Sequence, residues 1–196
     1  MTLLSIVQDC ADDIGLPRPS SLVGAVDISA RRFLIAAKRT GEHLYRRHNW
    51  SILHREHSFE TEADEPNYAV PEDFGRPMQM VAWDRAQFWR MRGNRSPGEW
   101  QRLKSSLIAS PGLRRSYRLL VGPLAGSILI DPTPSSVAEL VIEYVSSFWS
   151  ETAAGAGQAT LGADDDEFRL DHELVALGIA WRAKKSNGLA YADDRP

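Results

Sequence analysis

The spacing of apolar residues changes twice along this 196-residue chain, and this change constrains the fold more than any other feature. Up to Trp50, apolar side chains recur every three or four residues, as on one face of a helix. After Trp50 they alternate with a period of two, which is typical of half-exposed strands, and the helical spacing returns near residue 163. The pattern predicts an α+β fold, in which two N-terminal helices and a C-terminal helix form a bundle with an inserted antiparallel β region.

Composition and turn residues divide the chain further. Small residues and glycines dominate the stretch before the last helix, which favours a flexible joint there. Turn residues separate the predicted strands at 78–83, 88–91, 117–121, 128–130 and 140–149. The predicted segments are the helical bundle (1–50 and 163–192), the inserted β region (51–150) with a short helix (96–106), the joint (151–162) and a tail (193–196).

Capping residues indicate where the helices begin and end. A first helix is predicted over residues 2–14, and a second from Asp27, a preferred N-cap residue, to about His48. The acids at 164–167 are expected to begin the last helix, because negative charge favours the positive end of the helix dipole. Asn187 followed by glycine is expected to end it.

The second helix is expected to have two different faces. One is an apolar stripe with small residues at its centre, including Gly41, which would let another helix or a neighbouring subunit approach closely. The opposite face is basic and is interpreted as a solvated helix side in preference to a binding surface. Its residues are Arg31, Arg32, Lys38, Arg39, Arg46 and Arg47.

The single cysteine and the absence of long apolar runs limit the setting of the protein. Cys10 cannot form a disulfide within the chain, and its position on an apolar helical stripe predicts core packing. The longest mostly apolar stretch, residues 140–149, is too short to span a bilayer. Residues 1–5 have no features of a secretion signal. We therefore expect a protein made in a reducing cytoplasm, without a membrane partner.

The net charge of −3 conceals an uneven distribution. Residues 85–118 carry a balance of +8, while residues 119–196 carry −7, and such asymmetry often marks a surface that meets another macromolecule. Arginine outnumbers lysine nineteen to four, which suits interface ion pairs. The residues predicted to form a subunit or partner interface are Arg90, Arg92, Arg95, Arg114, Arg115, Arg118, Asp164, Asp165 and Asp166. An alternative places the arginines along a channel facing DNA.

No group of residues has the spacing of a catalytic or metal site. His54 and His57 fall on opposite faces of a predicted strand, and the acids at 164–167 lack the ligand pattern of a calcium loop. Glu72 and Asp73 are the acids that a hydrolase would use, and this alternative stays open. A nucleic-acid-binding regulator that uses the +8 segment is a further alternative. The sequence favours a protein that is not an enzyme and has no cofactor and no metal.

Several short motifs then occur in a familiar order. They are LYRRHNW (44–50), YAVPEDF (68–74), SPGEW (96–100), ILIDPTP (128–134) and GIAWR (178–182). Together they resemble the head-to-tail adaptor family of podovirus-like tailed phages, the head-completion or tail accessory factors, over residues 2–192.

The resemblance implies a structural protein of the virion at the portal vertex, made in the host cytoplasm. Such a protein forms a ring of twelve copies below the portal and extends a channel through which genomic DNA passes without specific binding. Its partners are the portal protein, further copies of itself, and a tail nozzle or another downstream neck or tail protein. The resemblance places portal binding on the last helix and the tail, at Trp181, Arg182, Lys184, Lys185, Asn187 and Tyr191.

Two alternatives stay open beside this interpretation. One is another neck or tail component, such as a head stopper, nozzle or tail tube protein. The other is a virion-associated peptidoglycan hydrolase that uses Glu72 and Asp73.

Overall fold

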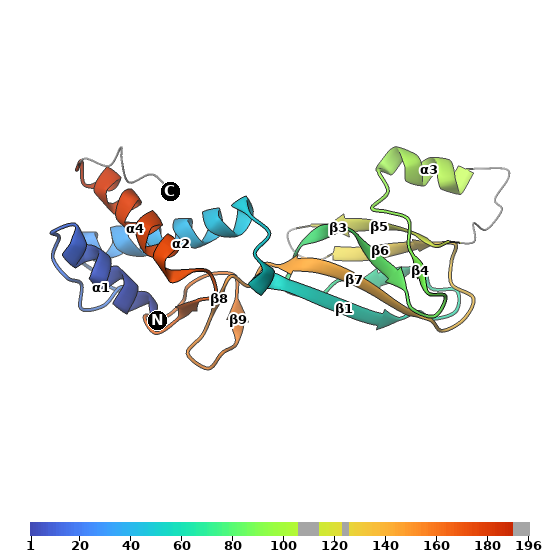
Figure 1. Ribbon diagram of the computed structural model, residues 1–196, viewed down its shortest axis with the longest axis horizontal. Helices are drawn as coiled ribbons and strands as arrows, with labels where there is room; N and C mark the ends of the chain where they lie inside the picture. The colour runs from blue at the N-terminus through green and yellow to red at the C-terminus, as the bar shows by residue number, and fades with distance from the viewer. Residues whose placement is uncertain (106–113, 123–125, 190–196) are drawn as a thin grey trace. The chain divides into compact units, whose positions relative to one another are not determined.

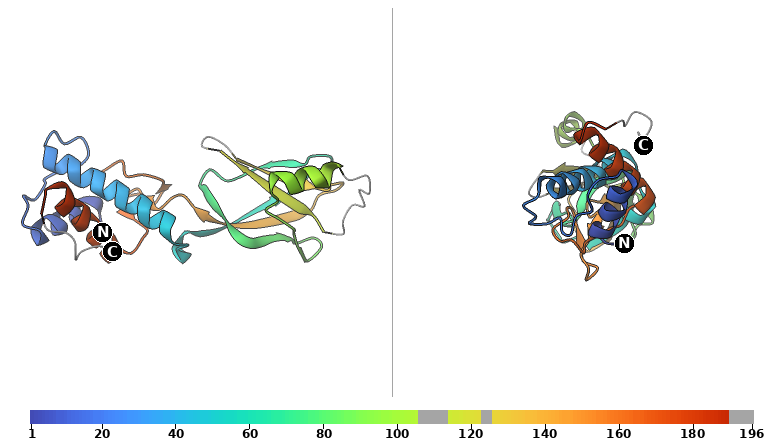
Figure 2. Two further views of the ribbon diagram at one scale, coloured as in Figure 1. Left: turned by 90° about the horizontal axis from the view of Figure 1, so that it is seen from above. Right: turned by 90° about the vertical axis from the view of Figure 1, so that its left-hand side faces the viewer.

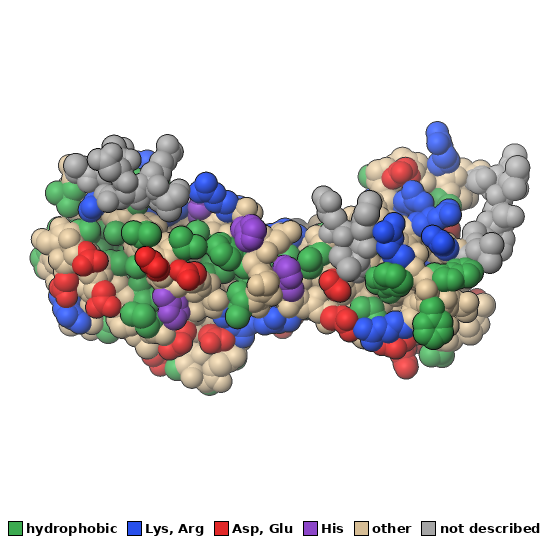
Figure 3. Space-filling model, viewed as in Figure 1, with side chains coloured by type: hydrophobic (Ala, Val, Ile, Leu, Met, Phe, Trp, Pro, Cys, Tyr) green, Lys and Arg blue, Asp and Glu red, His purple; other side chains and the backbone are tan. Residues whose placement is uncertain are grey.

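The computed structural model describes residues 1–105, 114–122 and 126–189, with the side chains of 79–81 left undescribed. The chain divides into two compact units. Unit 1 comprises Met1–Leu53 and Ser146–Pro196, and unit 2 comprises His54–Val145 (Figure 1). Helices and strands occur in both, so the expected mixed α+β class is confirmed. Charged side chains of both signs are visible among hydrophobic and other side chains on the viewed face of each unit (Figure 3).

The elements of unit 1 are α1 (Leu3–Asp13), α2 (Ile28–Arg47), a 3-10 turn η1 (Ser51–Leu53), β8 (Ser150–Glu151), β9 (Gly157–Gln158), β10 (Glu167–Phe168) and α4 (His172–Ser186). The elements of unit 2 are β1 (His54–Glu60), β2 (Asn67–Ala69), β3 (Phe74–Asp84), β4 (Trp89–Arg90), α3 (Pro97–Ser105), β5 (Ser116–Val121), β6 (Gly126–Asp131) and β7 (Glu139–Ser146, whose last residue is assigned to unit 1).

The cap of the second helix agrees with the sequence analysis, and the first helix begins one residue later than expected, with Thr2 as its cap. The Thr2 hydroxyl accepts a hydrogen bond from the Ser5 amide at 3.3 Å and begins α1. The Asp27 carboxylate accepts from the Ala30 amide at 2.8 Å and begins α2. A capping box begins α3, because Ser96 and Glu99 exchange hydrogen bonds between side chain and backbone. These caps satisfy backbone amides that have no partner inside a helix.

The expected start of the last helix was wrong. The cap of α4 is Asp171, whose carboxylate accepts from the Leu174 amide at 3.0 Å. The acids at 164–167 precede it: Asp164, Asp165 and Asp166 lie in a turn that leads into β10, and Glu167 is the first residue of that strand. The Asp166 carboxylate accepts from the amides of Gly162 and Ala163, so it caps this turn and not a helix.

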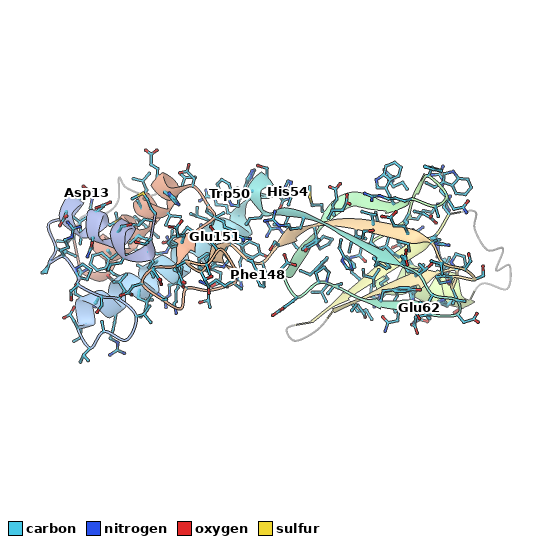
Figure 4. The ribbon with its side chains drawn as sticks, turned by 90° about the horizontal axis from the view of Figure 1, so that it is seen from below. Asp13, Trp50, His54, Glu62, Phe148 and Glu151 are labelled. Atoms are coloured by element: carbon cyan, nitrogen blue, oxygen red, sulfur yellow. The ribbon has the colours of Figure 1, made fainter. Side chains whose placement is uncertain are left out.

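The segment predicted as a flexible joint is a packed part of unit 1. Ser150 pairs with Gln158 in a short hairpin between β8 and β9, and the Ser150 hydroxyl also hydrogen-bonds to the Thr160 carbonyl at 2.9 Å. Leu161 is fully buried. Gly157 lies so close to the Phe148 ring that a Cβ atom there would stand 2.7 Å from it. Phe148 lies in the chain that leads into β8 (Figure 4). Small residues allow close packing as well as freedom, and in the structure this segment is packed.

The helices of unit 1 pack against one another, and α4 contacts both α1 and α2 (Figure 1, Figure 2). The small residues of the α2 stripe permit the close approach that the sequence indicated. A Cβ atom at Gly41 would stand 2.2 Å from the buried ring of Trp149. One at Gly178 of α4 would stand 2.5 Å from Thr40. The close approach therefore takes place within the chain.

Unit 2 contains two antiparallel sheets around one core. The strand orders are β1-β7-β3-β4 and β2-β6-β5. Side chains of both sheets, such as Ile142 of β7 and Ile130 of β6, belong to the same buried cluster. Strand β7 lies between β1 and β3 and has buried residues on both of its faces. It ends at Ser146 and not at Trp149, because the Ser146 hydroxyl accepts from the Phe148 amide and turns the chain.

The packing of Gly41 generates a first prediction. Replacement Gly41→Ala is expected to lower the free energy of unfolding of unit 1 by about 1–3 kcal/mol, because the added methyl group overlaps Trp149. Urea denaturation followed by tryptophan fluorescence measures this change. Gly98→Ala is the matched control, since nothing lies within 4 Å of its added Cβ atom. An unchanged midpoint for Gly41→Ala would contradict the close approach.

A second prediction concerns Cys10, which is buried as the sequence indicated. Burial raises the pKa of its thiol to about 12, with smaller contributions from Asp13 and Asp9. Because the thiolate is the reactive form, Ellman's reagent at pH 8 should react at least about 100-fold more slowly with the native protein than with protein in urea. Equal rates in the two conditions would show that Cys10 is accessible.

Candidate interaction surfaces

The C-terminal helix brings several of the predicted portal-binding residues together. The Arg182 guanidinium lies 5.0 Å from the centre of the Trp181 ring, and the Lys185 amine lies 5.5 Å from it. Arg182 also donates to the Thr40 hydroxyl at 3.2 Å and to the Gly178 carbonyl at 3.1 Å. Burial and then the charge of Arg39 lower the pKa of Arg182. The guanidinium is thus held in one orientation between α2 and α4.

The remaining predicted portal-binding residues differ in role. Asn187 caps the C-terminus of α4, and its side chain donates to the Ala183 carbonyl at 2.8 Å. It also accepts from Arg32 of α2 at 3.0 Å. Lys184 is half-buried. Tyr191 lies outside the described residues.

A groove of about 600 Å³ lies between α2 and α4. From α4 it is lined by Trp181, Arg182, Lys185 and Ser186, and from α2 by Arg32, Ile35, Ala36 and Arg39. The sequence analysis missed the α2 contribution, because it interpreted the basic face of this helix as solvated. Ile35 is the sequence signal that could have found it, because this apolar residue lies on the same helical face as Arg32 and Arg39. In the structure its side chain is 49% exposed.

The arginines of unit 2 differ in their surroundings: some form ion pairs within the unit, and others are exposed at its surface. Figure 3 shows basic side chains gathered on the viewed face of unit 2, below α3. Arg115 forms a buried ion pair with Asp84 at 3.3 Å, and the exposed fractions of the two side chains are 16% and 5%. Arg95 pairs with Glu99 at 3.4 Å. The Arg92 backbone amide donates to the Arg115 carbonyl, and this hydrogen bond joins the segment after β4 to the residue before β5.

Other predicted arginines remain at the surface. Arg90 and Arg114 are exposed, and Arg118 is half-buried on β5. Their interface role stays a prediction. Arg85, also within the +8 segment, bridges Glu56 at 2.7 Å and Glu139 at 3.0 Å. Part of the positive charge in the sequence is therefore matched by acids of the same unit.

The β3–β4 hairpin of unit 2 presents an aromatic surface that the sequence analysis did not select. Phe88 is 86% exposed and has a φ of 57°, in the left-handed region that bulky residues rarely adopt. Trp83 is 45% exposed. Asp84 holds the turn, since its carboxylate accepts from the Gln87 amide at 3.0 Å in addition to pairing with Arg115. Exposed aromatic side chains on a fixed turn are typical of protein interfaces.

The predicted interface acids lie in unit 1. Asp164 accepts from the backbone amides of Leu22 and Val23 at 2.8–3.1 Å. Asp166 is 2% exposed. Asp165 is exposed. The structure accounts for two of these acids by contacts within unit 1, and the interface role of all three stays a prediction.

The two acids considered for hydrolysis, Glu72 and Asp73, differ in their surroundings. The Asp73 carboxylate accepts from the Tyr144 hydroxyl at 2.6 Å, and Glu72 is exposed. Burial and then the hydrogen bond and charge of Asp73 raise the pKa of Tyr144. Within the described part of the chain, no three His, Cys, Asp or Glu residues lie close enough to hold a metal ion. The described helices include none that is both long and apolar enough to cross a membrane.

The buried ion pair generates a third prediction. Arg115→Glu is expected to destabilise unit 2 by about 3–5 kcal/mol, because it places two acids together in a buried site. Arg114→Glu, at an exposed neighbouring position, is expected to change stability by less than about 0.5 kcal/mol. Urea denaturation of both variants measures the difference. Equal effects would contradict the structural role of Arg115. Of these two residues, the exposed Arg114 is the cleaner probe of an interface.

Comparison with known proteins adds one finding. A family model described as SU10 adaptor protein matches residues 1–195, nearly the whole chain. A search of curated proteins finds no match. The chain belongs to the SU10 adaptor protein family, a family of phage adaptors.

Proposed function

We propose that this protein is a structural head-to-tail adaptor that forms a ring below the portal of a tailed phage and joins it to the tail. The family match over residues 1–195 is the observation that carries the proposal. In this role the protein extends the channel through which genomic DNA leaves the head. It acts by binding other proteins and is not an enzyme.

The surfaces of the two units support an assembly of many copies. A closed ring of identical subunits uses heterologous contacts, so one surface of a subunit must complement a different surface of its neighbour. Unit 1 has the groove between α2 and α4, and unit 2 has exposed arginines and the aromatic hairpin. We propose that the exposed arginines, with Arg114 as the cleanest example, meet acids of a neighbouring subunit in a ring of twelve copies.

We assign the portal-binding role to α4 and its surroundings, and the opposite partner to a tail nozzle or another downstream neck protein. Trp181 and Arg182 support this assignment, because tryptophan and arginine are the residues that most often anchor protein interfaces. DNA passes through the ring without specific binding. The net charge of −3 is consistent with this, since retention of DNA needs many exposed cations. The site of action is the portal vertex of the virion, after synthesis in the host cytoplasm.

Electron microscopy provides the fourth prediction. The purified protein, mixed with portal rings of the same phage, is expected to add a second ring stacked coaxially on the portal. Class averages viewed along the axis count its subunits, with twelve expected. Portal rings of an unrelated phage serve as the matched control and should remain bare.

Bare cognate portals beside free adaptor would reject the portal-binding role. That result would move the protein to a position farther down the neck or tail. A stacked ring with another number of subunits would retain the adaptor role and correct the copy number.

A further inference from the structure

The groove between α2 and α4 combines positive charge with an apolar wall. Four cationic residues line it, namely Arg32, Arg39, Arg182 and Lys185, and no acidic residue stands among the described lining residues. Two of the other lining residues, Ile35 and Trp181, contribute apolar surface. This composition differs from the surface around Arg85 in unit 2, where acids of the same unit neutralise the guanidinium.

The positive charge affects neighbouring groups. Arg39 contributes to lowering the pKa of Arg182, after burial. The pKa of His43, one turn along α2 from Arg39, is lowered by burial and then by the charges of Arg182 and Arg47. In both cases burial is the larger cause, and the neighbouring cations add to it because they disfavour a further positive charge. An anionic ligand would relieve this repulsion.

Part of the groove is already arranged to receive carboxylates. Arg182 is fixed by Thr40 and by the Gly178 carbonyl, and Arg32 is fixed by Asn187. A guanidinium has a planar set of donors that matches a carboxylate. Because these side chains are ordered before a ligand arrives, binding costs less conformational entropy.

The apolar wall decides between two kinds of anionic ligand. Ile35 is 49% exposed, and its burial favours a ligand that presents an apolar side chain. The phosphates of duplex DNA need cations alone and would leave Ile35 against a charged backbone. A groove of about 600 Å³ also has the size of a site for a few side chains. These features favour a peptide segment over DNA.

We propose that the groove between α2 and α4 binds an acidic segment of the portal protein, in which carboxylates flank an apolar side chain. The carboxylates pair with Arg39 and with the ordered guanidinium of Arg182, and the apolar side chain packs on Ile35. This proposal rests on the portal-binding function proposed above. It adds the chemistry of the segment that the portal must supply.

Two surface variants test the proposal, and this is the fifth prediction. Arg39→Glu reverses one charge of the groove, and Ile35→Asp places a charge on its apolar wall. Arg31→Glu is the matched control for the first, because Arg31 is an exposed arginine of α2 that does not line the groove. Val137→Asp, at a 67% exposed position of unit 2, is the control for the second.

The measurement is binding of the full-length protein to immobilised portal rings of the same phage by biolayer interferometry. Each groove variant is expected to weaken binding by about tenfold or more, and each control by less than about threefold. Circular dichroism verifies that the variants fold, and Arg39→Ala replaces the reversal if that variant does not. A 30-base-pair DNA duplex is the second probe and should not be retained.

Each contrary outcome has a distinct meaning. Wild-type affinity of both groove variants for the portal would overturn the groove proposal and leave the adaptor function intact. Failure of the wild-type protein to bind the portal would overturn the adaptor function as well. Retention of the DNA duplex by the wild type, together with its loss in Arg39→Glu, would assign the groove to nucleic acid and also overturn the proposal.

Discussion

The antiparallel pairing of β1 with β7 is the constraint on which the rest of the structure depends. His54, the first residue of β1, pairs with Val145 near the end of β7. The chain therefore leaves unit 1 and returns to it at adjacent points, although ninety-two residues lie between them. This return allows Trp149 to pack on Gly41 and α4 to pack on α1 and α2. Without the pairing, the two halves of unit 1 would have to meet across a long and unrestrained loop, at a cost in chain entropy.

Arginine has two separate uses in this protein. Arg115 and Arg182 are oriented by contacts inside their own units, with Asp84 in one case and with Thr40 in the other. Arg39 and Arg114 are exposed on α2 and before β5. The first kind stabilises a unit: removal of Arg115 would leave the buried Asp84 without its counter-charge, and removal of Arg182 would break its hydrogen bonds to Thr40 and the Gly178 carbonyl. The second kind is available to a partner chain. A count of charges along the sequence cannot separate the two kinds.

The surfaces suited to binding lie apart from the cores that support them. The aromatic turn at Phe88 follows β3, whose Ala82 belongs to the core between the two sheets of unit 2. The groove of unit 1 lies over α2 and α4 where Gly178 brings the helices together. Rigid packing below a surface reduces the entropy lost on binding. Each unit therefore provides a surface of its own chemistry on a packed core.

Local patterns in the sequence determined the elements that depend on near neighbours. The caps at Thr2 and Asp27, the capping box at Ser96, the burial of Cys10 and most strands followed from residues within a few positions of each other. The order of several motifs also indicated the adaptor family.

Only the tertiary structure decided the features that depend on distant contacts. Asp164 accepts a hydrogen bond from the Leu22 amide, 142 positions away in the sequence. The residues next to Asp164 carry no information about this contact, so the sequence indicated only that the acid begins a helix. The packed hairpin at 150–158 depends on Phe148 and on the hydrogen bonds of Ser150, and glycine content alone suggested a joint. The division of the strands into two sheets follows from pairing partners that apolar alternation does not specify. Ile35 of α2 and Trp181 of α4 line the same groove. The apolar periodicity of one helix carries no information about which residues of another helix lie opposite it.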